Sequence, residues 1–119
     1  MNELFKKTDF FITINKDNVF NSIECRKGNP IYDEVTEEYM ALIDLVNEKL
    51  EPNALIGIGK LPQELAGEER PKDAPVLYVL LTLGNKVSKL SEKYFAKGDY
   101  LAGMLIDAMA DDYLFQMDN

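Results

Sequence analysis

The sequence predicts an α+β fold, a small antiparallel sheet with flanking helices, formed by a single domain that spans residues 1–119. Segments with the three- or four-residue apolar spacing of a helix alternate along the chain with shorter segments rich in β-branched and aromatic residues. A chain of this length can bury about two thirds of the surface that it exposes when unfolded. Hydrophobic residues make up 46% of the chain and charged residues 29%, as in ordinary globular proteins, so we expect a packed core.

Three strands are predicted, near residues 9–14, 54–59 and 75–83. Residues 9–14 (DFFITI) are dense in aromatic and β-branched types, and residues 54–59 (ALIGIG) follow a proline that closes the preceding helix. Residues 75–83 are nearly all apolar, which predicts a strand that is buried on both faces and central in the sheet. Residues 61–74 contain prolines and many charges, and we expect them to form an exposed loop.

The first two helices are predicted near residues 17–25 and 31–50. Gly28 is expected to take a positive φ and end the first of them. In the second, apolar residues recur at intervals of three or four: Ile31, Val35, Tyr39, Leu42, Val46 and Leu50. Acidic residues crowd its first two turns, where the helix dipole favours anions, and we interpret them as a solvated helix start and not as a cation site.

Two further helices are predicted near residues 86–97 and 99–117. The first is amphipathic, with apolar residues on one side and lysines on the other. Gly98 is expected to end it, and Asp99 to cap the next helix. Residues 99–117 are apolar around most of the circumference, which predicts a helix that is buried or that pairs with another chain.

Asp107 lies in the middle of this apolar helix. Burying a carboxylate is costly unless it is hydrogen-bonded, paired or protonated. We therefore expect Asp107 to have a partner, either the backbone amides that follow Gly84 or a ligand.

Composition excludes several functions. The net charge of −8 repels phosphate backbones and anionic lipids, so neither nucleic acid nor a membrane surface is expected as a partner. The chain has no histidine and a single cysteine, Cys25, which removes the usual zinc ligand sets, the Ser-His-Asp triad and an internal disulfide. The longest apolar run, residues 76–81, is too short to span a membrane. We expect a cytoplasmic protein without a metal site.

Four short motifs occur in an order that resembles a known family. They are a strand ending in Leu-Thr-Leu-Gly at 81–84, the Gly-Asp pair at 98–99, the sequence Leu-Ile-Asp-Ala at 105–108, and, upstream, a charged helix ending in Glu-Pro-Asn-Ala at 51–54. Together they resemble the activation domain of vitamin B12-dependent methionine synthase, and more closely the small stand-alone bacterial proteins that carry this domain.

The resemblance implies a fold and a chemistry. The family has a twisted antiparallel sheet with flanking helices and binds S-adenosylmethionine, whose methyl group is transferred to inactive, oxidised cobalamin after reduction by a flavodoxin-type donor. The partner would be a corrinoid-binding protein or domain, and this chain would have little or no catalytic capacity alone. Residues placed to contact S-adenosylmethionine would be Thr82, Gly84, Asn85 and Asp107, which combine a helix-start turn with a nearby carboxylate.

The sequence departs from the family pattern in two places. A Gly-Ser pair that usually follows the Asp-Ala motif is absent, and residues 109–112 are Met-Ala-Asp-Asp instead. An arginine followed by Gly-Tyr, which such domains use around S-adenosylmethionine, has no counterpart, because the only arginines are Arg26 and Arg70. We expect that motif downstream of Asn119, and hence that this chain is the N-terminal half of a larger activation-like domain.

Two alternatives remain from the sequence. One is a non-enzymatic interaction or assembly module in which the helix near 99–117 forms a homodimer through Leu101, Leu105 and Met109. The other is a small enzyme that uses Asp107 together with Lys86 or Tyr78.

Overall fold

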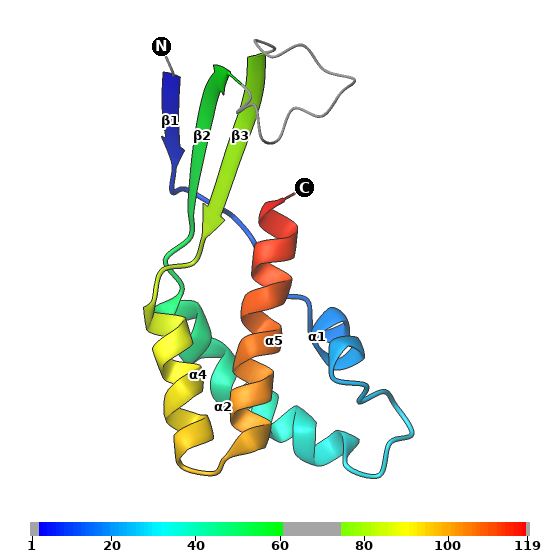
Figure 1. The fold of residues 1–119 in the computed structure, drawn as a ribbon. Coiled ribbons are helices and arrows are strands. Elements are labelled where there is room, and N and C mark those ends of the chain that lie inside the picture. The colour runs from blue at the N-terminus through cyan, green and yellow to red at the C-terminus, as the bar shows by residue number, and fades with distance from the viewer. Residues whose placement is uncertain (1–2, 61–74, 119) are drawn as a thin grey trace, which may run out of the picture.

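The computed structural model describes residues 3–60 and 75–118. Within these ranges the chain forms four α-helices and one three-stranded antiparallel sheet (Figure 1), which confirms the predicted α+β fold. The elements in chain order are β1 (Glu3–Lys7), α1 (Lys16–Ser22), α2 (Tyr32–Lys49), β2 (Asn53–Lys60), β3 (Pro75–Thr82), α4 (Lys86–Ala96) and α5 (Tyr100–Met117). The four helices and two of the three strands lie where the sequence predicts them. The loop predicted at 61–74 lies outside the described residues.

The sheet has the order β1-β2-β3, with both pairs antiparallel. Phe5, Ile56 and Val79 lie opposite one another across the three strands. The prediction that residues 75–83 form the central strand is wrong, since β2 is central and β3 is an edge strand whose Leu80 side chain is 59% exposed. An apolar run is compatible with a buried strand, but it does not by itself show what covers the strand.

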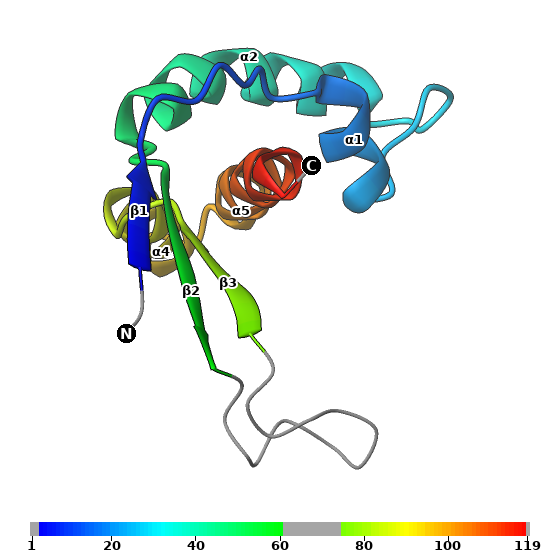
Figure 2. The ribbon, with the colours of Figure 1, turned by 90° about the horizontal axis from the view of Figure 1, so that it is seen from above.

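The strand predicted at 9–14 is also wrong, because these residues follow β1 as an extended segment without strand pairing. The side chains alternate: Phe10, Ile12 and Ile14 pack against the helical core, whereas Phe11 between them is 97% exposed. Figure 2 shows this segment running along α2 toward α1. The residue types therefore indicated an extended backbone correctly, but not a partner strand.

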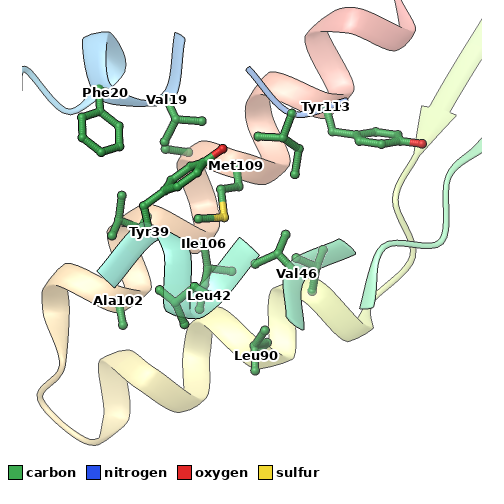
Figure 3. Packing of buried hydrophobic residues seen from close by; sticks show 14 of the residues in the cluster. Val19, Phe20, Tyr39, Leu42, Val46, Leu90, Ala102, Ile106, Met109 and Tyr113 are labelled. Carbon is green, nitrogen blue, oxygen red and sulfur yellow. The ribbon is translucent and has the colours of Figure 1, made fainter. Parts of the chain in front are cut away.

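The hydrophobic core lies among the helices, with α5 at its centre. Leu105, Ile106 and Met109 of α5 are completely buried, and they pack with side chains from α1, α2 and α4 (Figure 3). The prediction that this helix is buried is confirmed, because its own chain covers it on several sides. Gly103 allows the closest approach, since a Cβ at this position would lie 2.7 Å from the ring of Phe95 in α4.

The predicted end of the helix before Gly98 is confirmed, and Gly98 has a φ of +84°, which favours glycine. Gly28 has the expected positive φ of +97°, but the prediction that it ends the first helix is wrong. α1 already ends at Ser22 with Ile23 as its C-cap, and Glu24 takes a positive φ of 57° directly after it. The side chain of Asp99 accepts a hydrogen bond from the Ala102 amide at 3.2 Å, as a helix cap does.

The sheet projects from the helical body, so the molecule is elongated (Figures 1 and 2). Its extents are 55 × 28 × 28 Å and its radius of gyration is 18.4 Å. A compact domain of this length has a radius of gyration of about 13.5 Å. The helices therefore enclose the core, while much of the sheet extends beyond it.

A candidate binding cleft between the sheet and two helices

The candidate functional site is a cleft where the end of β3, the start of α4 and the middle of α5 meet. It has a volume of about 360 Å³. Its lining residues are Leu81, Thr82, Leu83, Gly84, Val87, Ser88, Asp107, Ala110, Asp111 and Leu114. The cleft thus combines apolar walls with two hydroxyl groups, two carboxylates and the first turn of a helix.

Gly84 forms the turn that carries the chain from β3 into α4. Its φ of +76° is unfavourable for other residues, and a Cβ at this position would lie 2.8 Å from the Glu51 carboxylate. Glu51 also donates its backbone amide to the carbonyl of Leu83 at 2.9 Å. Glu51, which lies between α2 and β2, therefore holds the turn after β3 in place. This contact positions the start of α4 at the cleft.

The first turn of α4 gives the cleft a positive pole. Asn85 is the N-cap residue, and its side chain makes no capping hydrogen bond to the helix. The first turn contains no acidic residue either. The amides at the start of an α-helix carry a partial positive charge, so this end of α4 favours a negatively charged group.

Two carboxylates of α5 give the opposite wall a negative charge. Asp107 and Asp111 are one helical turn apart, and both line the cleft. Burial raises the pKa of Asp111 above its usual value, and the nearby Asp107 carboxylate raises it further. A bound cation would relieve this repulsion.

The structure brings together three of the four residues predicted to contact a ligand. Thr82, Gly84 and Asp107 line the same cleft, although 23 residues separate Gly84 and Asp107 in the sequence. Asn85 follows Gly84 directly but does not line the cleft. Asp111 and Ser88 were not predicted, although each lies about one helical turn beyond a predicted residue, Asp107 or Asn85.

The expectation that Asp107 is a buried acid is wrong, because its side chain is exposed on the cleft side of α5. The buried acid is Asp112, which is 7% exposed. It accepts hydrogen bonds from the Asn15 amide at 2.7 Å, from the Asn18 side chain at 3.0 Å and from the Gln116 side chain at 2.8 Å.

The helical period explains this difference. Asp112 follows Leu105 by two full turns and therefore shares its buried face, whereas Asp107 lies on the opposite side of the helix from Met109. The Asp112 carboxylate links the start of α1 to the last turns of α5. Burial and the same carboxylate raise the pKa of Tyr39, which lies in the adjoining core.

The two alternatives from the sequence receive no support from these positions. Neither Lys86 nor Tyr78 lines the cleft with Asp107, and the Lys86 ammonium lies 3.9 Å from Glu51 instead. Leu105 and Met109 are covered by their own chain, so they offer no surface for a helix-mediated dimer.

Within residues 3–60 and 75–118, no group of three His, Cys, Asp or Glu side chains is close enough together to hold a metal ion. None of the described helices has the length and apolar character needed to cross a membrane. Comparisons with models of protein families, with curated proteins and with solved structures gave no match to this chain.

Proposed function

We propose that the cleft binds S-adenosylmethionine and that the chain supports the reductive re-methylation of cobalamin carried by a corrinoid protein. The observation that carries this proposal is the convergence of Thr82, Gly84 and Asp107 on one cleft. The motifs that contain these residues are those in which the sequence resembles the activation domain of methionine synthase.

The charges of the cleft suit this ligand. S-adenosylmethionine has two positive groups, a sulfonium and an ammonium, and one carboxylate. Asp107 and Asp111 can pair with a positive group, while the first turn of α4 can accept the carboxylate. Leu81, Val87 and Leu114 provide apolar surface for the uncharged parts of the ligand.

The size of the cleft indicates which of the two cofactors of the proposed reaction this chain would bind. A volume of about 360 Å³ lies within the range of small-molecule sites. A corrinoid ring is too large for it, so we assign cobalamin to the client protein. S-adenosylmethionine would supply a methyl group on a positively charged sulfur, and the residues of this chain would bind and orient that group.

Calorimetric titration with S-adenosylmethionine and with S-adenosylhomocysteine tests the proposal. The second compound lacks the sulfonium charge, so the wild-type chain should bind the first more tightly. Asp107→Asn combined with Asp111→Asn should remove most of this preference and leave binding of the uncharged sulfide nearly unchanged. The matched control is Asp44→Asn with Glu48→Gln, which removes two exposed charges from α2 and should keep the preference.

The proposal would be rejected if neither compound bound, or if the Asp107 and Asp111 variant kept the full preference for the sulfonium. Thr82→Val gives an independent check, because it replaces a hydroxyl of the cleft by a methyl group of similar size. Weaker binding of both compounds by this variant would support the same site.

A further inference from the structure

The two edges of the sheet differ in how they are protected against pairing with another strand. β1 carries two exposed lysines, Lys6 and Lys7, and charged side chains of this kind discourage edge pairing. β3 contains no charged residue in its eight positions, PVLYVLLT. Its outer edge pairs with no other strand among the described residues. Such an edge is a template for an added strand.

A groove runs beside this unprotected edge. It lies between β3 and the last turns of α5, has a volume of about 490 Å³, and is lined by Val79, Leu81, Asp111, Leu114, Phe115 and Asp118. Figure 2 shows α5 on the β3 side of the sheet, away from β1. The groove and the outer edge of β3 are therefore adjacent, and one bound segment could contact both.

The chemistry of the groove indicates what would occupy it. Its walls are apolar, and among the residues that the structure describes its charged lining residues are two acids, Asp111 in α5 and Asp118 directly after this helix. Burial already raises the pKa of one of them, Asp111. A second copy of the chain would bring a further charge of −8 to this surface, whereas a segment with basic side chains would be attracted to it.

We propose that β3 and this groove bind an extended polypeptide segment that carries both apolar and basic side chains on one of its two faces. The segment pairs with β3 as a fourth, antiparallel strand. Because every second side chain of a strand points to the same side, its apolar side chains on the α5 side lie over Val79 and Leu114, and its basic side chains on that side lie close to Asp111 and Asp118. This inference does not depend on S-adenosylmethionine binding, although the groove and the cleft share Asp111.

The test uses the full chain and a fluorescein-labelled ten-residue peptide in which valine and lysine take turns at the odd positions and threonine occupies the even positions, so that one face carries both valine and lysine. Fluorescence anisotropy should show that this peptide binds at least tenfold more tightly than the same peptide with glutamate in place of lysine. A valine-lysine peptide with two central prolines has the same charge but cannot pair as a strand, and it should bind as weakly as the acidic peptide.

Two variants locate the peptide. Asp111→Asn with Asp118→Asn should weaken binding about fivefold, as expected for two partly exposed ion pairs. The control pair Asp44→Asn with Glu48→Gln should change it less than twofold. Hydrogen exchange should show protection, on peptide binding, of those β3 amides that do not pair with β2, and of no comparable set in β1.

Equal binding of the basic peptide and its proline version would overturn the proposal, because the attraction would then be charge alone. Protection of the β1 edge would also overturn it. If the outer β3 amides were already protected without peptide, and this protection rose with protein concentration, a second copy of the chain would be the occupant instead.

Discussion

Helix α5 of the helical body and strand β3 of the sheet are both built from largely apolar sequence, yet the two regions bury their apolar residues very differently. In the body, α5 is surrounded by α1, α2 and α4, and side chains such as Ile106 have no exposed surface. In the sheet, more than half of the Phe5, Val79 and Leu80 side chains is exposed. Burial therefore follows from what the topology places next to a strand or helix, and the apolar content of a segment does not determine it.

The largest expected effect contrasts the two regions directly. Met109→Ala in the body should lower the free energy of unfolding by about 3 kcal/mol, because it removes completely buried atoms and leaves a cavity. Leu80→Ala in the sheet should lower it by less than about 1 kcal/mol, since most of that side chain is already exposed. Urea unfolding of both variants measures the difference. Equal losses would mean that the sheet is covered in solution.

The next effect concerns the polar link within the body. Asp112→Ala should cost about 2 kcal/mol, because it leaves donors of Asn15, Asn18 and Gln116 without their acceptor. Asp107→Ala is the matched control on the same helix, and its exposed carboxylate predicts a change within about 0.5 kcal/mol. A larger loss for Asp107→Ala than for Asp112→Ala would contradict the assignment of the buried acid.

Close packing between α4 and α5 gives a third prediction. Gly103→Ala should lower the free energy of unfolding by about 1–2 kcal/mol, since the added methyl group collides with the Phe95 ring. Phe95→Leu should recover part of this loss in the double variant, and a double-mutant cycle measures the recovery. Purely additive losses would show that the two residues do not share this contact.

The smallest effect is a pH dependence at the boundary between the two regions. The folded chain raises the pKa of Asp111, so it favours the protonated acid. The stabilisation from this group is fully present below the unfolded pKa of 3.8 and is lost as the pH rises through the higher folded pKa. Asp111→Asn should therefore gain stability relative to wild type at pH 7, by about a few tenths of a kcal/mol because the site is partly solvated, and show no such gain at pH 3. Parallel urea titrations at the two pH values measure this difference. An equal effect of Asp111→Asn at pH 3 and at pH 7 would contradict the raised pKa.

Local patterns predicted most of the helical body. Helical apolar spacing placed α2 and α5, and glycine and aspartate placed the break between α4 and α5 at Gly98 and Asp99. These signals involve residues that are close together in the sequence, so they can be read from one sequence alone. The order of strands does not, because nothing in the composition of β3 shows whether one strand or two lie beside it.

The candidate site was predicted only in part, because local patterns identify single residues of the site but not how these residues come together. Thr82 and Gly84 are signalled by the turn after β3, and Asp107 by its apolar surroundings. Which acid of α5 is buried depends on the face of the helix that meets α1, and a closer count from Leu105 would have selected Asp112. The convergence of Asp107 with Gly84 across 23 residues is a tertiary contact that local patterns do not contain.

The elongated shape affects how the mass of this protein is measured in solution. A particle about twice as long as it is wide, at 55 × 28 × 28 Å, experiences more friction than a sphere of the same 13.5 kDa. It will elute early from gel filtration, and calibration with globular standards would overestimate its mass. Light scattering or sedimentation equilibrium, which do not depend on shape, will separate a true dimer from an elongated monomer.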